Sequence, residues 1–128
     1  MMGKPVSTSA GGICFAFPDV CNTPIGVGTV PVPYPNVGQL SDAQSVSDTV
    51  RAAGNPVIRD NSNIPTTTGD EAGSASPTKG KVEFAKASQT VFCDSGKAVV
   101  RMFDTTKQNN GNAVGIVLGG VPTVMVGD

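Results

Sequence analysis

Three cysteines are the residues of this chain best suited to chemistry, and their spacing allows three arrangements. Cys14 and Cys21 are separated by the six residues FAFPDV, and Cys93 lies far along the chain. The thiols could be small buried hydrophobes, two of them could form a disulfide that leaves one odd thiol, or they could bind zinc. The gap between Cys14 and Cys21 is wider than the roughly two to four residues usual between paired zinc cysteines. The spacing alone therefore leaves all three alternatives open.

The chain contains no histidine, which excludes several kinds of active site at once. Ser-His-Asp and Cys-His catalysis, histidine-rich zinc sites and histidine pH switches all need an imidazole. Asp70 and Glu71 in GDEAG are adjacent and point apart, which predicts a tight acidic turn rather than an acid–base pair or a calcium loop. Asp94, Asp104 and Arg101 lie near predicted strand ends and indicate surface ion pairs. Since no nucleophile can be paired with a base, the sequence predicts a protein without enzymatic activity.

The composition favours one small, rigid β-domain. The 128 residues include 16 glycines and 10 prolines but no tryptophan and one tyrosine, which predicts a thin core of short side chains. A net charge of −1 gives no basic face for nucleic acid. No stretch approaches the roughly 20 apolar residues of a membrane span, and no secretion signal is visible at the N-terminus. We therefore expect the protein to start in the cytoplasm with reduced thiols.

The first part of the chain predicts two unlike segments after a loose start. Residues 1–12 are rich in glycine, serine and threonine and predict a flexible N-terminus. Residues 13–38 carry many prolines between apolar residues, which predicts a stiff and mostly irregular segment. The capping pair Ser41 and Gln44, with apolar residues near helical spacing, predicts one short helix at about 42–53.

The rest of the chain predicts short strands joined by turns. Residues 59–80 are polar and indicate a long surface loop. Residues 81–104 resemble two strands about the turn DSG, and 105–112 resemble another turn. Residues 113–128 predict a strand, a Gly-Gly turn and a second strand that Pro122 confines to an edge or a strand start. The predicted class is mainly β.

Several motifs, taken in order, resemble one known family. The stretch CFAFPDVCNTPIGVGTVPVPYPN is similar to the opening of the PAAR-like proteins, GDEAG at 69–73 to their central motif, and SQTVFCDSGKAVVRMFDTTKQNNGN at 88–112 to the hairpin and Asn-rich turn that follow. The resemblance covers about residues 13 to 112 or beyond. It implies a single small cone-shaped domain of short strands and Pro/Gly-rich loops over residues 13–128.

The resemblance also implies a role. PAAR-like proteins are the spike tips of type VI secretion systems and related contractile injection machines. The implied partner is a trimeric VgrG-type spike, capped by one tip per trimer, with an effector or chaperone as a further partner and only transient contact with the target membrane. The implied path runs from the cytoplasm to injection through the cell envelope. The tip sharpens the spike for membrane puncture and carries or recruits a toxic effector.

A metal site is a further implication of the resemblance. PAAR proteins of similar shape hold zinc near the apex with three histidines and one cysteine, and this chain has no histidine. A retained site would use Cys14, Cys21 and Cys93, with Cys14 and Cys21 close together. Asp19 or water would complete the ligand set, or three thiolates would suffice. Zinc is therefore the cofactor that the resemblance implies.

The resemblance implies that the broad base of the cone docks on the spike, where open strand edges need a cover. The run AVGIVLGGVPTVMV at 113–126 is expected to form part of this base, because it is the most apolar run of the chain and carries little charge. The residues expected to contact the spike are Val117, Leu118, Val121, Val124 and Val126. Two other functions stay open from the residues alone. One is a small metal-binding or redox module that uses the three thiols, and the other is a stand-alone hydrolase or toxin.

Overall fold

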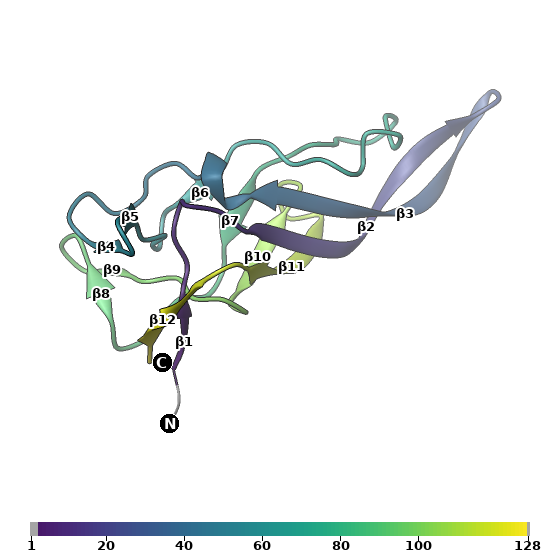
Figure 1. Cartoon of the computed structure of the whole chain (residues 1–128). Coiled ribbons are helices and arrows are strands. Elements are labelled where there is room, and N and C mark those ends of the chain that lie inside the picture. Colours follow the sequence, from purple (N-terminus) through teal and green to yellow (C-terminus); the bar gives the residue numbers. More distant parts are fainter. Residues whose placement is uncertain (1–2, 128) are drawn as a thin grey trace.

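The computed structural model describes residues 3–127, and their regular structure consists almost wholly of antiparallel strands joined by loops (Figure 1). The one helical element among them is a 3₁₀ turn at Leu40–Asp42, and no helix is long and apolar enough to cross a membrane. The expected mainly β class is confirmed. The strands are β1 (Lys4–Val6), β2 (Ile13–Ile25), β3 (Gly28–Gln39), β4 (Arg51–Ala52), β5 (Asn55–Pro56), β6 (Asn63–Ile64), β7 (Val82–Phe84), β8 (Phe92–Cys93), β9 (Lys97–Ala98), β10 (Thr105–Gln108), β11 (Ala113–Leu118) and β12 (Val121–Val126).

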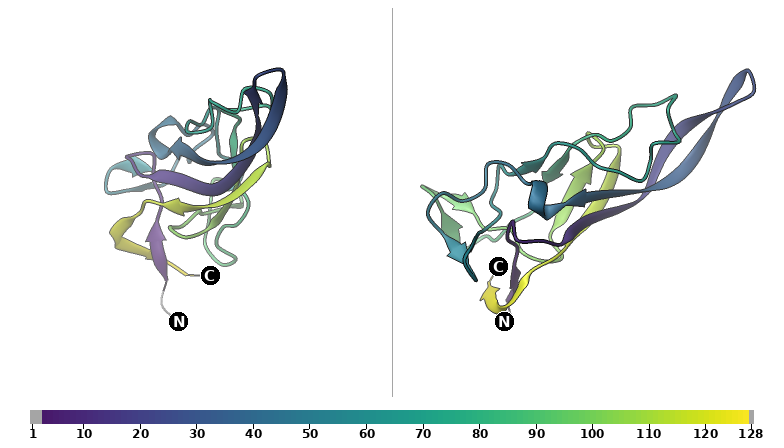
Figure 2. Two further views of the ribbon diagram at one scale, coloured as in Figure 1. Left: turned by 90° about the vertical axis from the view of Figure 1, so that its right-hand side faces the viewer. Right: turned by 45° about the horizontal axis from the view of Figure 1, so that its top comes forward.

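The molecule tapers from a broad end to one projecting hairpin (Figure 1, Figure 2). Strands β2 and β3 extend past the other elements and turn at Gly26 and Val27. The opposite end holds three two-stranded ribbons, formed by β1 with β12, β4 with β5, and β8 with β9. We call these three ribbons together the blunt end.

One six-stranded sheet joins the hairpin to the body, in the order β3-β2-β11-β10-β7-β6. Its inner face covers a core of short side chains, and its outer face is exposed at Phe15, Phe17 and Val114. A sheet with one buried and one open face is the usual antiparallel arrangement. The buried core cluster comprises Cys14, Leu40, Ile58, Ile64, Val82, Phe84, Val100 and Val117.

The proline-rich segment is regular, which corrects the expectation of an irregular stretch over 13–38. Pro31, Pro33 and Pro35 occupy alternate positions of β3, an edge strand of the large sheet. In an antiparallel pair every second residue directs its N–H away from the partner strand. Prolines at these positions remove no ladder hydrogen bond, and they leave the open edge without donors for another chain. The same prolines that argue against a central strand are therefore compatible with this edge.

A bulge in β2 sets which side chains point inward. Ala16 pairs with Asn36 and Asp19 pairs with Tyr34, so β2 has one residue more than β3 between these pairs. The extra residue reverses the alternation of the strand. Cys14 and Ala16 face the interior before the bulge, and Asp19 and Cys21 face it afterwards. The bulge is therefore what places the carboxylate of Asp19 inside the domain.

The helix predicted at about 42–53 does not form. Ala43 is extended, and Ser45 has a left-handed φ of 58°. The Ser47 hydroxyl accepts the backbone N–H groups of Thr49 and Val50, so a local turn replaces helical hydrogen bonds. Beyond it, Ala53 and Gly54 both have positive φ and form the two-residue loop between β4 and β5. The glycine expected to end a helix closes a hairpin instead.

Both ends of the chain are paired in a way that the sequence did not indicate. Within the segment 1–12 that was expected to be flexible, β1 pairs with β12, and Val6 is buried. The two strands predicted in 113–128 both form, but they do not pair with each other. Strand β11 joins the large sheet, and β12 lies in a two-stranded ribbon, where Pro122 is at an edge as expected.

The hairpin geometry predicts opposite effects for neighbouring substitutions in β3. Val32→Pro removes an N–H that points toward β2 and should cost about 3 kcal/mol of unfolding free energy. Pro33→Ala changes a residue whose nitrogen points outward and should cost at most about 1 kcal/mol, through the unfolded chain. Urea denaturation of the two variants measures this. Equal losses would show that the assigned alternation is wrong.

Candidate functional site

The structure does not bring the three cysteines together. Cys14 and Cys21 lie on the same strand, and seven residues of extended chain span roughly 20 Å. Cys14 is in the core cluster under the large sheet, whereas Cys93 is in a second cluster at the blunt end. All three are buried and free. The expectation that Cys14 and Cys21 lie close together is therefore wrong.

A buried network of carboxyl and amide groups lies where β2, β3 and the loops meet. Its centre is the Asp19 carboxylate, which is fully buried. Asn109 donates to both of its oxygens at 3.2 Å, Asn112 donates to Oδ1 at 2.5 Å, and Asn36 donates to Oδ2 at 3.3 Å. We call Asp19, Asn36, Asp70, Gln108 and Asn109 the polar centre.

Asn36 and Gln108 connect this carboxylate to the rest of the fold. The Asn36 amide also donates to Thr67 at 2.7 Å and to Asp70 at 3.1 Å. Gln108 donates to the Asn36 side-chain oxygen at 2.9 Å and to the backbone oxygens of Asn36 and Cys14. No buried side-chain polar atom in the described part of the chain lacks a partner. A fully satisfied network of this kind favours one arrangement of its segments.

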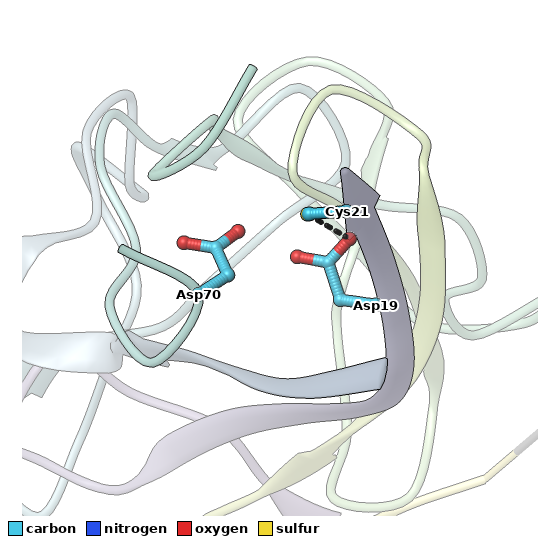
Figure 3. A group of neighbouring side chains, drawn as sticks. All are labelled: Asp19, Cys21 and Asp70. Carbon is cyan, nitrogen blue, oxygen red and sulfur yellow. Dashed lines mark hydrogen bonds between the residues drawn. The ribbon is translucent and has the colours of Figure 1, made fainter. Parts of the chain in front are cut away.

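Asp19 and Asp70 face each other, and Cys21 lies beside them (Figure 3). Burial and the neighbouring Asp19 raise the pKa of Asp70 to about 6. Burial also acts to raise the pKa of Asp19, but hydrogen bonds from Asp70, Asn112 and Asn109 outweigh it and hold the pKa below its ordinary value. The pair therefore shares a proton more readily than two exposed carboxyls do, with the proton on Asp70.

This arrangement does not fit a thiolate zinc site made of Cys14, Cys21 and Cys93. The one group of candidate ligands among residues 3–127 is Asp19, Cys21 and Asp70. Burial and the charge of Asp19 raise the pKa of Cys21 to about 11, and its thiol donates to Asp19 at 3.6 Å. This group contains one of the three expected cysteines, and amide donors already occupy the Asp19 oxygens. Hydrogen bonds join the three residues to one another and to the surrounding amides.

The motifs that carry the family resemblance meet at the polar centre. Asp19 comes from PDVC, Asn36 from PYPN, Asp70 from GDEAG and Asn109 from NNGN. The second glycine of GDEAG, Gly73, is required there because a Cβ would lie 2.3 Å from the Cβ of Cys21. Residue chemistry alone missed this network, since a neutral asparagine gives no signal of a site. The recurrence of asparagine in two separated motifs was the available clue.

Asp104, expected in a surface ion pair, and Asp70, expected in an acidic turn, are both buried. Asp104 accepts three hydrogen bonds from Arg101, including Nη2 to Oδ1 at 2.8 Å, and both side chains are almost fully buried. Asp70 is likewise buried rather than part of an exposed acidic turn. Asp94 accepts from Ser47 and pairs with Arg59 at 3.0 Å. These groups hold loops in place, so surface ion pairing is not their main role.

The residues expected to contact a spike differ in exposure. Val117 belongs to the core under the large sheet, and Val126 belongs to the cluster at the blunt end. Neither buried side chain is available to a partner, which corrects their assignment. Leu118 and Val121 are half-buried, and Val124 is exposed.

The three ribbons of the blunt end share one small core. Val6 and Val126 enter it from β1 and β12, Ala52 comes from β4, and Cys93 comes from β8. Each ribbon also has apolar side chains exposed within it or directly before it. They are Val124 and Met125 in β12, Val50 directly before β4, Val91 directly before β8, and Phe92 in β8. Three similar ribbons around a common core give this end three comparable but unequal faces.

A comparison with known protein families shows to which family the chain belongs. A family model described as the Toxin PAAR-like domain matches residues 12–115, and the chain belongs to this family. The chain is also similar to the DNase toxin Tse7 of Pseudomonas aeruginosa, with 38% identity over 115 residues. That match covers 78% of this chain and 29% of the relative, so the chain spans less than a third of the relative's length. No solved structure matches the chain significantly.

The shared proton of the polar centre predicts an unusual pH dependence. Between the ordinary pKa of aspartate, about 4, and about 6, folded Asp70 keeps a proton that the unfolded chain releases. Stability should therefore fall as pH rises through this window and then level off. Below it, stability should fall again as Asp19 becomes protonated, because its pKa is lowered in the folded state. Melting temperatures between about pH 3 and pH 8 measure this profile.

Asp70→Asn should flatten the profile between about pH 4 and pH 6.5, since the amide keeps a donor for Asp19 and does not titrate. The matched variant Asp19→Asn loses the charged acceptor of three amides and should cost about 2 kcal/mol or more at neutral pH, with a smaller cost at low pH, where Asp19 itself becomes protonated. An unchanged pH profile in Asp70→Asn would contradict the shared proton.

Proposed function

We propose that this domain is the tip of a contractile injection spike and caps a trimeric VgrG-type protein with its blunt end. The observation that carries the proposal is the set of three ribbons around one core, at the end opposite the projecting hairpin. One tip on three chains needs three comparable faces, and the ribbons supply them. Family membership supports the same role.

The chemistry of the blunt end suits docking. Phe92 and Met125 are each more than half exposed, although both are large apolar side chains. Aromatic residues and methionine are enriched in protein interfaces. The short strands of the ribbons also leave free edges that a partner's strands can extend. On this proposal the tip is exported with the spike, from the cytoplasm through the cell envelope, together with an effector or chaperone.

Docking predicts one tip per spike trimer. Phe92→Asp and Met125→Asp should each weaken the complex by roughly thirtyfold, since a charge replaces a central apolar contact. Val114→Asp is the control, because Val114 is exposed on the outer face of the large sheet rather than on a ribbon. Size-exclusion chromatography with light scattering on mixtures with the cognate VgrG-type trimer gives affinity and stoichiometry. Three tips per trimer, or no complex, would refute the proposal.

A second candidate function is DNA cleavage, because the similar Tse7 is named a DNase toxin. We propose that these 128 residues do not themselves cleave DNA. The chain has no histidine, and its paired carboxyls, Asp19 and Asp70, are fully buried, so a phosphodiester cannot reach them. Incubation of the purified chain with plasmid DNA and magnesium or manganese should leave the plasmid intact. Cleavage that Asp70→Asn abolishes, in a folded variant, would establish the nuclease instead.

A further inference from the structure

Each ribbon of the blunt end carries one basic residue. Lys4 lies in β1, Arg51 in β4 and Lys97 in β9. None of the six ribbon strands contains an acidic residue. The chain as a whole has a net charge of −1, so the positive charge of these strands is a local feature.

The buried acids next to the ribbons do not neutralise these three charges. Asp94, in the loop between β8 and β9, is already paired with Arg59 at 3.0 Å. Asp104 binds the buried Arg101 through several hydrogen bonds, and Lys4 is only an outer contact at 3.7 Å. Lys4 and Arg101 therefore share the carboxylate of Asp104, and the Lys4 side chain is half-buried, whereas Arg101 is fully buried.

Arg51 and Lys97 have no ion pair within 4.0 Å among residues 3–127. Arg51 donates to the backbone oxygen of Gly54 in its own hairpin, which leaves its charge unbalanced. Two exposed carboxylates, Asp48 and Asp60, lie on the loops before β4 and after β5. The ribbon strands themselves carry three basic side chains and no acidic one, and these two acids lie on the adjoining loops.

We propose that the blunt end recognises an acidic group on each of three partner chains, with one group facing each of Lys4, Arg51 and Lys97. This inference rests on the proposed docking of a trimeric spike and adds the chemistry of the partner's end. The exposed apolar side chains supply most of the affinity, and the three charges guide the approach and fix the rotation of the tip. Charges at the rim of an interface act mainly on association rate and specificity.

The three basic residues of the ribbons, Lys4, Arg51 and Lys97, predict a salt-dependent association. Raising the salt concentration from about 0.05 M to about 0.5 M screens charges beyond a few ångströms and should slow association of the tip with the cognate VgrG-type trimer. The triple variant Lys4→Gln, Arg51→Gln and Lys97→Gln should bind roughly tenfold more weakly and lose most of the salt dependence. Surface plasmon resonance measures both quantities.

A matched control removes the same charge elsewhere. The control is a second triple variant, Lys79→Gln, Lys81→Gln and Lys107→Gln. Lys79 and Lys81 precede β7 and Lys107 is in β10, so all three lie outside the ribbons. This variant should keep an affinity and a salt dependence near those of the parent. Melting temperatures confirm that both triple variants fold. If the Lys4 change unfolds the protein, the double variant Arg51→Gln and Lys97→Gln replaces it and should show an intermediate loss.

The outcomes separate this inference from the function on which it rests. If the parent binds the trimer but both triple variants weaken binding equally, or neither weakens it, then Lys4, Arg51 and Lys97 do not recognise acidic groups of the partner. The docking proposal stands in that case. If the parent forms no complex with the trimer, both fail.

Discussion

The buried carboxylate of Asp19 is the interaction on which the rest of the structure depends. It accepts amide hydrogen bonds from β3 and from the turn at 109–112, and it faces Asp70 from the long loop. No ion pair with a cation forms there among the described residues, so amide donors satisfy the charge. A buried carboxylate is costly unless it is satisfied in this way. The bulge in β2 points Asp19 inward, and the network then fixes the hairpin against the body.

This polar centre divides the domain into two regions with different roles. Beyond it, β2 and β3 continue as a hairpin, and prolines at alternate positions of β3 remove donors from that strand's outer edge. On the other edge, the backbone of Asn22 in β2 is hydrogen-bonded to Ala75 and Ser76 of the long loop. On its other side the apolar core clusters hold the sheet and the three ribbons. In the polar centre, hydrogen bonds of defined direction hold β2, β3, the long loop and the turn at 109–112 in one relative position. The blunt end instead uses small apolar contacts and leaves strand edges open, which suits a surface that a partner completes.

The sequence predicted the class of fold well and the site poorly, for identifiable reasons. Turn residues and short apolar runs indicated a mainly β domain, and DSG marked the hairpin of β8 and β9. The helix near 42–53 does not form because its backbone N–H groups donate to Ser47 and Asp94 instead of to helical carbonyls, and Asp94 is remote in sequence. The prolines at alternate positions of residues 13–38 predicted an irregular segment, because the sequence does not show that β3 lies at the edge of the sheet, where such prolines are tolerated. Cysteines were favoured as ligands for their chemistry, whereas the structure relies on the asparagines of the family motifs.

The central claim is that the ribbons face the spike and the hairpin points away from it. A cryo-electron microscopy reconstruction of the domain on its cognate VgrG-type trimer tests this most directly, computed without imposed threefold symmetry. The account predicts one copy on the trimer axis, with β1–β12, β4–β5 and β8–β9 against the three chains and Val27 at the far end. Density that places the Val27 loop against the trimer, or that shows three copies around the axis, would contradict it.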